Sequence, residues 1–156
     1  MSLESVRAFL AKHAPDIKIL IHDGSTATVD QAASAHGVPP AAIAKTLSLT
    51  VNGTPFLVVA SGTARLDNRK AKERFGGKVS MLGSDDVQRL TGHPIGGVCP
   101  FGLATDLPVY CDVSLKAFEE VIPAAGSPNS ALRIATARLA ELTGANWIEI
   151  CSLPET

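Results

Sequence analysis

The sequence predicts an α/β (α+β) fold in which a compact, mixed and partly closed barrel-like sheet is surrounded by short helices. Two observations lead to this prediction. Expected strands and helices alternate irregularly along the 156 residues, and the expected helices, at about 8–12 residues, are too short and uneven for the regular crossovers of a doubly wound sheet. The length, with no internal repeat and no linker, fits one domain over residues 1–156.

The first predicted elements are a helix, marked by an N-cap residue and a terminating proline, and the strand that follows it. Ser2 is an expected N-cap, after which apolar side chains fall on one helix face at Leu3, Val6, Phe9 and Leu10. Pro15 ends this helix, because its ring cannot continue the hydrogen-bond pattern. Ile17–His22 is the first expected strand.

A second helix is predicted by its capping pattern. Thr28 and Gln31 have the spacing of a capping box, which predicts a short helix over Val29–His36. Gly37 is suited to the left-handed conformation that ends it. Pro39–Ala44 is expected to form one more helical turn that leads into a strand.

The strongest local signal predicts a β-hairpin. Thr46–Val51 and Pro55–Ala60 are apolar, β-prone stretches on either side of Asn52-Gly53. Asn-Gly tolerates the positive φ angles of a type I′ turn, so the two stretches are expected to pair as antiparallel strands.

Two helices are expected in the middle of the chain. Asp67 is a suitable cap for a basic helix that runs to Phe75 and ends at Gly76-Gly77. Ser84 is the expected cap of a second helix over Asp85–Leu90, where first-turn aspartates suit the helix dipole.

The last third of the chain begins with an irregular segment, Thr91–Leu103, that is rich in glycine and proline. Strands are expected at Val109–Val113, Val121–Ala125, Ala131–Ile134 and Trp147–Cys151, the middle two joined by a turn at Gly126–Ser130. A helical turn is expected at Leu115–Glu119, and a last helix is expected from the cap Thr136 to Leu142, with Gly144 at its end.

Charge is distributed unevenly in this nearly neutral chain, whose formal net charge is −1. Six Lys/Arg residues and two acidic residues fall within positions 65–78, so this segment carries +4 and the rest of the chain −5. The near-neutral total excludes a wholesale basic coat for nucleic acid, and the low aromatic content, 4%, argues against a long stacking platform. The basic segment is either a solvated helix face or a surface for phosphate contacts.

Cysteine usage and hydropathy indicate the compartment. Cys99, Cys111 and Cys151 are widely spaced and form no C-x-x-C pair, so neither a disulfide framework nor a zinc site is suggested. Free thiols fit a reducing cytosol. No apolar stretch approaches the roughly 20 residues of a membrane span, so a soluble cytoplasmic protein without membrane contact is expected.

Two features are candidates for chemistry. Lys45 stands in an apolar stretch, where it is either a snorkelling edge residue or a lysine held at a cleft to meet a phosphate or a polar ligand. The segment 92–102 contains four glycines and two prolines besides His93 and Cys99. It is either a structural turn or a loop whose amides at Gly96 and Gly97 approach a ligand oxygen, and it matches neither a Walker loop nor a Rossmann fingerprint.

The sequence gives only weak support for other catalytic arrangements. Cys99 with His93 as its base is one alternative, but a lone cysteine is more often a small buried hydrophobe. The four histidines, His13, His22, His36 and His93, have no metal-binding spacing. Ser127 and Ser130 lie in an expected turn without a G-x-S-x-G elbow.

Three short motifs in combination resemble one family. Ala44–Leu47 follows a Pro-Pro-containing turn, Gly96–Pro100 is a G-x-x-x-P loop, and Ala125–Ser127 forms a late turn. In this order and spacing they resemble the YbaK/ProX/EbsC family of freestanding aminoacyl-tRNA editing domains, which are related to the editing insertion of bacterial prolyl-tRNA synthetases. The resemblance spans nearly the whole chain.

This resemblance implies the editing-domain fold and a trans-editing activity. The implied reaction is hydrolysis of the ester that joins a wrong amino acid to the 3′ end of tRNA, generally tRNA(Pro), and a small uncharged amino acid is expected, alanine first and cysteine second. The family uses no metal, no cofactor and no enzymic nucleophile. The implied partners are the aminoacyl-adenosine end of tRNA and prolyl-tRNA synthetase, and the protein is expected to be a monomer or a homodimer.

The resemblance also implies roles for individual residues. Lys45 is expected near the terminal adenosine and its phosphate, while backbone amides of the Gly96–Pro100 loop, Gly96 and Gly97 above all, would hold the aminoacyl carbonyl as an oxyanion hole does. Further residues expected near the substrate are Val98, Cys99, Pro100, His22, Ser61, Gly126 and Ser127. The basic side chains expected to contact tRNA are Arg69, Lys70, Lys72 and Arg74.

Two other functions remain open from the residues themselves. One is a module that binds tRNA or an aminoacyl-adenosine without turnover, because no nucleophile is evident. The other is a thiol hydrolase that depends on Cys99.

Overall fold

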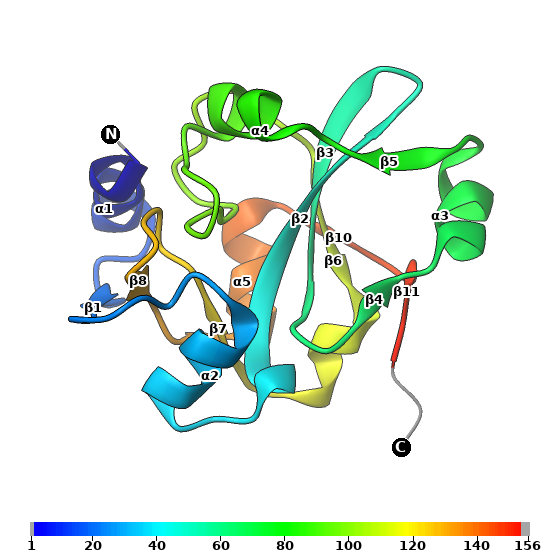
Figure 1. Ribbon diagram of the computed structural model, residues 1–156. Coiled ribbons are helices and arrows are strands. Elements are labelled where there is room, and N and C mark those ends of the chain that lie inside the picture. Colours follow the sequence, from blue (N-terminus) through cyan, green and yellow to red (C-terminus); the bar gives the residue numbers. More distant parts are fainter. Residues whose placement is uncertain (1, 154–156) are drawn as a thin grey trace.

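A curled, mixed sheet forms the centre of the protein in the computed structural model, which describes residues 2–153 (Figure 1). Within these residues the sheet has seven strands: β2 (Ile43–Val51), β3 (Thr54–Ser61), β5 (Val79–Met81), β6 (Val109–Asp112), β7 (Glu120–Pro123), β9 (Ile134–Ala135) and β10 (Asn146–Ile148). Two short ladders flank it: β1 (Leu20–Ile21) with β8 (Ser130–Ala131), and β4 (Arg65–Leu66) with β11 (Cys151–Ser152).

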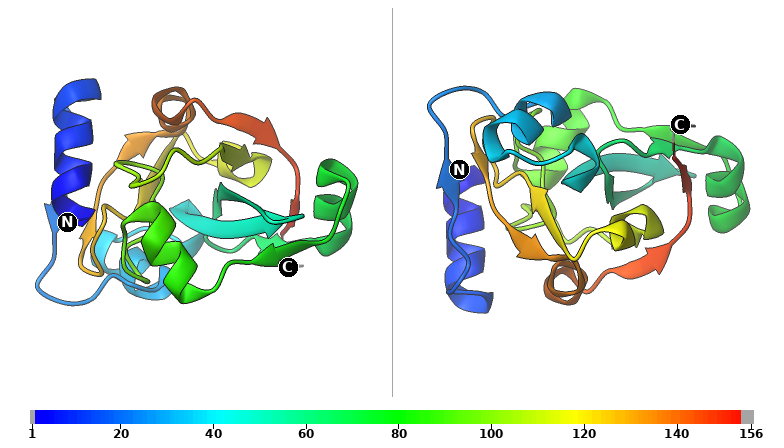
Figure 2. Two further views of the ribbon diagram at one scale, coloured as in Figure 1. Left: turned by 90° about the horizontal axis from the view of Figure 1, so that it is seen from above. Right: turned by 90° about the horizontal axis from the view of Figure 1, so that it is seen from below.

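Five α-helices surround the sheet: α1 (Ser2–His13), α2 (Val29–His36), α3 (Asn68–Phe75), α4 (Ser84–Thr91) and α5 (Thr136–Thr143). Two short 3-10 helices, η1 (Pro40–Ala42) and η2 (Val113–Ala117), precede β2 and follow β6. The views of Figure 2 place α1 and α3 at opposite ends of the molecule. This curled half-barrel with peripheral helices confirms the predicted α/β class. None of the helices in residues 2–153 is long and apolar enough to cross a membrane.

The strand order is β10-β6-β3-β2-β7-β9, with β5 paired to β2 beside this path. The hairpin of β2 and β3 is antiparallel, whereas β6 and β10 join it in parallel on one side and β7 joins it in parallel on the other. The sheet therefore combines one local antiparallel hairpin with parallel strands on both sides, and parallel neighbours require longer crossover connections.

The core lies on both faces of the sheet, and β3 contributes to both. Leu57 and Val59 belong to a large apolar cluster that includes side chains of α1 and α5, whereas Phe56 and Val58 belong to a second cluster that includes Ala71 of α3. A strand covered on both faces explains why the β3 sequence is a continuous apolar run instead of an alternating one.

Most turn and cap predictions are confirmed. Asn52 and Gly53 have φ angles of 51° and 79°, as the turn between β2 and β3 requires. Thr28 and Gln31 form the capping box of α2, and Asp67 accepts hydrogen bonds from two backbone amides at the start of α3. The predicted irregular segment after α4 contains no helix or strand before β6.

Three predicted caps are wrong. Ser2 is itself helical, and its hydroxyl donates to the carbonyl oxygen of Gly126. Gly83, without a side-chain bond, is the N-cap of α4, and Ser84 is the first helical residue. Thr136 is likewise the first residue of α5, and its hydroxyl donates to the carbonyl oxygen of Phe118 at 2.6 Å. The hydroxyls of Ser2 and Thr136 therefore make tertiary contacts instead of capping a helix, and α4 begins without a side-chain cap.

Three predicted strands are shorter or divided. The strand expected over Ile17–His22 is reduced to β1, the one expected over Ala131–Ile134 is divided between β8 and β9, and the one expected over Trp147–Cys151 is divided between β10 and β11. Each divided strand changes its partner: β8 pairs with β1 and β9 with β7, while β10 pairs with β6 and β11 with β4. Apolar content marks buried extended chain, but it does not show where a strand changes partner.

Candidate active site

A gap in the sheet opens beside β2. β3 pairs with β2 along its length, but the opposite edge of β2 pairs with β7 at Ile43 and Ala44 and with β5 at Leu49–Val51. Among residues 2–153 no strand lies beside residues 45–48 on that edge. The gap exposes main chain in the middle of a central strand.

The register of the hairpin shows which main-chain groups face this gap. The carbonyl oxygen of Ile43 accepts from the amide of Gly62 on the β3 side, so alternate residues, among them Thr46 and Ser48, direct N–H and C=O to the gap. The amide of Leu82 donates a hydrogen bond to the carbonyl oxygen of Ser48 at 2.9 Å. The main chain of Thr46 is therefore presented to whatever enters the gap.

A cavity of about 400 Å³ occupies this place, a volume within the usual range for small-ligand sites. Its wall comes from β2, the start of α2, α4, β7 and the glycine-rich loop. Apolar lining residues include Val29, Ala32, Ile43, Val98, Ile122 and Ala131. Polar lining residues are Thr26, Thr28, Lys45, Thr46, Ser48 and Ser84.

Lys45 is the one basic residue among the described residues that line the cavity. Its Nζ atom donates to the carbonyl oxygen of Gly62 at 3.2 Å and to that of Ala64. Burial lowers the pKa of Lys45 below its ordinary value of 10.5. An ammonium group has three donors, so two carbonyl contacts hold the group in place and leave one N–H for a ligand.

Thr46 also lines the cavity, and sequence reasoning did not single out its side chain. Its Oγ1 atom is buried and has no hydrogen-bond partner among the described residues. An unpaired buried hydroxyl costs free energy, so this side chain lowers stability at a residue that lines the cavity. No local pattern in the sequence distinguishes this threonine from others in strands.

The glycine-rich loop is only partly at the cavity. Gly96 and Val98 line it, whereas Gly97 and Pro100 do not. Gly96 has a φ angle of 91°, and a Cβ atom there would lie 2.8 Å from the Cβ of Ala27. The loop therefore approaches the segment before α2 as closely as a residue without a side chain allows.

The amide of Gly97, which was expected to bind the aminoacyl carbonyl, is engaged inside the loop in this structure. Its N–H already donates to the carbonyl oxygen of Pro94 at 2.9 Å, inside the loop. A Cβ atom on Gly97 would lie 2.6–2.7 Å from backbone atoms of Ser127. Glycine is needed here for close packing of the loop against the late turn.

Cys99 and His93 meet in the structure, but away from the cavity. Their Sγ and Nε2 atoms are 3.6 Å apart, and both side chains are fully buried. Burial raises the pKa of Cys99 to about 12, so the thiolate that a nucleophile requires is absent at neutral pH. The Nε2 atom of His93 lies 2.8 Å from the carbonyl oxygen of Phe101.

The remaining residues expected near the substrate do not line the cavity. Ser61 is buried and donates to the carbonyl oxygen of Ala41 at 2.7 Å. Gly126 packs against the start of α1, and the Ser127 hydroxyl bonds within its own turn. His22 contacts His36, with 3.0 Å between their Nε2 atoms.

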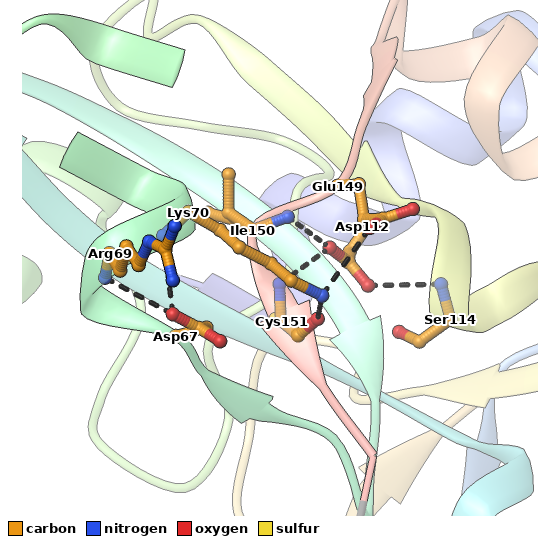
Figure 3. Close-up of polar contacts among 8 residues, drawn as sticks. All are labelled: Asp67, Arg69, Lys70, Asp112, Ser114, Glu149, Ile150 and Cys151. Carbon is orange, nitrogen blue, oxygen red and sulfur yellow. Dashed lines mark hydrogen bonds and ion pairs between the residues drawn. The ribbon is translucent and has the colours of Figure 1, made fainter. Parts of the chain in front are cut away.

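Lys70, on the predicted basic surface, is engaged within the molecule. Its Nζ atom donates to the carbonyl oxygen of Cys151 at 3.2 Å and lies 3.3 Å from a carboxylate oxygen of Glu149 (Figure 3). These contacts attach α3 to the C-terminal strand. The lysine therefore has a structural partner, and its charge is partly balanced before any ligand arrives.

The other basic side chains of α3 are more exposed. Arg69 forms a solvent-exposed pair with Glu73, and the guanidinium of Arg74 lies over the rings of Phe75 and Tyr110 at 5.2 and 5.7 Å. Lys72 is exposed. Weak surface pairs such as these exchange readily with a phosphate.

Comparisons with known proteins agree with this architecture. Residues 23–142 match the family described as "Aminoacyl-tRNA editing domain". The protein YwhH of Bacillus subtilis, described as uncharacterized, is 46% identical over 97% of this chain and 98% of its own. A protein of Enterococcus faecalis, described as "Putative Cys-tRNA(Pro)/Cys-tRNA(Cys) deacylase EbsC", is 29% identical over 79% of this chain and 76% of its own.

Solved structures also share the fold. One reported under the name "Crystal structure of a putative trans-editing enzyme for prolyl tRNA synthetase" superimposes with a TM-score of 0.89 at 34% identity, over 99% of this chain and 98% of that one. The family match covers well over half of the residues, and the fold agrees over nearly the full length. The chain belongs to the aminoacyl-tRNA editing domain family, the YbaK/EbsC proteins related to the editing domains of prolyl-tRNA synthetases.

Proposed function

We propose that the protein is a trans-editing deacylase, which hydrolyses the ester between a wrong amino acid and the 3′ end of tRNA. The proposed substrate is tRNA(Pro) that carries a small uncharged amino acid, alanine first and cysteine second. The observation that carries this proposal is that Lys45 and Gly96 both line one cavity of about 400 Å³.

Lys45 binds and orients the substrate in this proposal. Two carbonyl oxygens hold its ammonium group, so its remaining N–H has a fixed direction toward a phosphate or hydroxyl of the terminal adenosine. Because the group is half-buried, its charge acts in a medium that screens it less than water does. A preoriented cation needs no reorganisation when the substrate arrives.

The ester is activated already, so positioning and polarisation of its carbonyl suffice for much of the rate. Gly96 and Val98, not Gly97, line the cavity, and their main-chain amides are the proposed contacts of the aminoacyl carbonyl. The Thr46 side chain adds a hydroxyl without a protein partner. These groups take the role of an oxyanion hole.

Water is the proposed nucleophile. The described residues that line the cavity include no histidine, cysteine, aspartate or glutamate. Water held near the ester, or a group of the substrate itself, then attacks the carbonyl carbon, and the tRNA 3′ oxygen leaves. No metal ion is assigned to this step.

Selectivity for a small side chain fits the apolar part of the cavity. Ala32, Ile43 and Ala131 bring aliphatic groups close together there. Such walls exclude a larger amino acid by steric clash. A synthetase pocket cannot exclude a smaller one in this way, and a missing methylene costs it only about 1–3 kcal/mol of binding free energy. A second site that admits alanine and excludes proline completes the sieve.

The test is a deacylation panel of tRNA(Pro) charged with alanine, cysteine, serine or proline, with EDTA present throughout. We expect rapid hydrolysis of the alanyl ester, slower hydrolysis of the cysteinyl ester and a stable prolyl ester. Lys45→Ala should lower the rate by about 100-fold, as the loss of a key electrostatic contact does, and Lys18→Ala, on an exposed loop, is the matched control.

Two outcomes contradict the proposal. Tight binding of the charged tRNA without any change in ester half-life would establish the non-catalytic module. Full activity of Lys45→Ala would show that Lys45 neither binds nor orients the substrate.

The exposed basic residues of α3 are the proposed tRNA contacts. Neutralising Arg69, Lys72 and Arg74 together should weaken tRNA binding and flatten its dependence on salt, because each lost phosphate contact reduces the slope by about 1. Lys70→Ala should change the slope less, since Glu149 and Cys151 already engage that side chain. An unchanged slope in the triple variant would show that α3 is a solvated surface that does not contact tRNA.

A further inference from the structure

Two histidines that are far apart in the sequence meet outside the cavity. His22 follows β1, and His36 ends α2. Their Nε2 atoms are 3.0 Å apart, their ring centroids are 4.6 Å apart, and the ring planes cross at 78°. No sequence spacing predicts this pair, because fourteen positions and a helix separate the two residues.

The two distances together describe how the rings point. A straight N–H···N hydrogen bond would align both ring axes with the line between the nitrogens and hold the centroids about 5.3 Å apart. The observed 4.6 Å is shorter, so the ring axes are inclined to that line. The two imidazoles therefore form a bent hydrogen bond, not a straight one.

The same distances fit two ligands of one metal ion. With metal–nitrogen bonds of about 2.0–2.1 Å, nitrogens that are 3.0 Å apart subtend an angle of about 94° at the metal, which separates the ring centroids by about 4.7 Å. This angle is near that of adjacent ligands in octahedral or square-planar coordination. Tetrahedral coordination requires a widening of the pair by only a few tenths of an ångström.

The surroundings hold both rings on fixed backbone. The side-chain amide of Asn129 donates to the carbonyl oxygen of His22 at 3.1 Å, and the guanidinium of Arg133 donates to that of His36 at 2.9 Å. Both histidine side chains are partly exposed, so an ion can reach them from solvent. The charge of Arg133 opposes a cation, but Glu120 lies 3.4 Å from that guanidinium and offsets part of it.

We propose that His22 and His36 form a binding site for a divalent transition-metal ion of the Ni²⁺, Cu²⁺ or Zn²⁺ class, with water in the remaining positions. Residues 2–153 contain no group of three or more His, Cys, Asp and Glu side chains that could hold a metal, so the protein supplies two ligands here. The affinity is accordingly lower than that of a structural zinc site with four protein ligands. The site does not depend on the proposed deacylase function.

The ion would tie the segment after β1 to the end of α2. The start of that helix contributes Thr28 and Val29 to the cavity wall, so a bound ion would stabilise the wall against movement. Binding to the folded state alone also raises the stability of the fold.

The test is calorimetric titration of untagged protein with Ni²⁺ and, separately, with Zn²⁺ at neutral pH. We expect one ion per chain, and affinity at least about tenfold lower in His22→Ala and in His36→Ala, because each variant removes one of two ligands. His13→Ala, which removes an exposed histidine of α1, is the control and should bind as the natural protein does. Equal affinity in all four proteins would overturn the proposal.

A second measurement does not depend on how the variants fold. Imidazole binds a metal ion only in its neutral form, so binding by the unaltered protein should weaken as the pH is lowered from about 7.5 to about 5 and should return on neutralisation. Binding that is unchanged over this range would place the ion on carboxylates and overturn the assignment to histidine. Paramagnetic broadening by Cu²⁺ should in turn be centred on the resonances of residues 22 and 36.

Discussion

The backbone nitrogen of Gly126 donates a hydrogen bond to the carbonyl oxygen of Gly97 at 3.0 Å. This bond joins the G-x-x-x-P loop to the late turn, two of the three motifs that carry the family resemblance. The two segments are in direct contact, and Gly97 is required by the backbone of Ser127 in the late turn, whereas Gly126 is required by the start of α1. The motifs therefore form one packing unit beside the cavity.

Gly97→Ala should destabilise the protein without removing any side-chain contact. Its new Cβ would lie 2.6–2.7 Å from the backbone of Ser127, where neither segment can yield easily. We expect the free energy of unfolding in urea to fall by about 1–3 kcal/mol, as in other overpacked sites. Gly24→Ala, which would meet nothing within 4 Å, should stay within about 0.5 kcal/mol. Equal effects of the two substitutions would show that the loop moves freely.

Thr46→Val should separate activity from stability. The Thr46 hydroxyl is buried and unpaired in the described structure, so its removal should leave the free energy of unfolding unchanged or raise it by up to about 1 kcal/mol. If the hydroxyl contacts the substrate, deacylation should fall by roughly tenfold, the value of one hydrogen bond. Thr50→Val, on the same strand but beside β5, is the matched control. Undiminished deacylation by Thr46→Val would mean that the hydroxyl plays no part.

Cys99→Ala should retain deacylation. The thiol is fully buried, and its pKa of about 12 excludes the thiolate at neutral pH. We expect a rate within about twofold of the natural protein and a loss of roughly 1 kcal/mol or more of stability from the space left behind. Steady-state kinetics and urea unfolding measure the two effects. A properly folded variant that has lost its activity would support the thiol hydrolase instead.

His93 should make the protein less stable in mild acid. Nε2 carries the proton that bonds to Phe101, while the buried Nδ1 has no partner among the described residues. Burial lowers the pKa of His93 below 6.5, and the bond to Phe101 offsets this only in part. As the pH falls below 6.5, the unfolded chain takes up a proton that the folded one refuses, so stability is lost.

Urea unfolding at a series of pH values between about 7.5 and 5 tests this effect. His93→Gln keeps a donor for Phe101 but cannot titrate, so the loss should be smaller in this variant. His36, whose pKa is also lowered, contributes the part that remains. The same pH dependence in both proteins would exclude His93 as its source.

Asp112→Asn should weaken the attachment of the C-terminal strand. One carboxylate oxygen accepts from the amides of Ile150 and Cys151 at 2.9 and 3.1 Å, and the other accepts from Ser114 at 2.9 Å (Figure 3). An asparagine would turn an NH₂ group toward one of these donors, which should cost about 2–4 kcal/mol. Asp106→Asn, at an exposed position, is the control. Equal stability of the two variants in urea would show that Asp112 does not attach the C-terminal strand.

Local chemistry made much of the fold predictable. Asn52-Gly53, the Thr28–Gln31 box and the Asp67 cap act through neighbours in sequence, and each appears where it was expected. Predictions failed where a distant segment decides the outcome. The last apolar stretch is divided because Asp112, far away in sequence, binds the amides of Ile150 and Cys151 between β10 and β11.

The candidate site was also predictable only in part, because some of its features depend on segments that are distant in the sequence. The resemblance pointed to Lys45 and Gly96, and both line the cavity. Thr46 was not identified as a site residue, because its significance lies in a missing partner that only the packed sheet reveals. His22 was expected at the substrate, but α2 places His36 beside it instead.

The interruption between β5 and β7 also determines what cannot enter the protein. An unpaired strand edge is usually a hazard, since it can recruit a strand from another molecule and begin aggregation. Here the open stretch of β2 spans residues 45–48 and has a neighbouring strand at either end. It is too short and too enclosed for a polypeptide to extend the sheet, so the opening that can receive a small ester is protected against amyloid-like association.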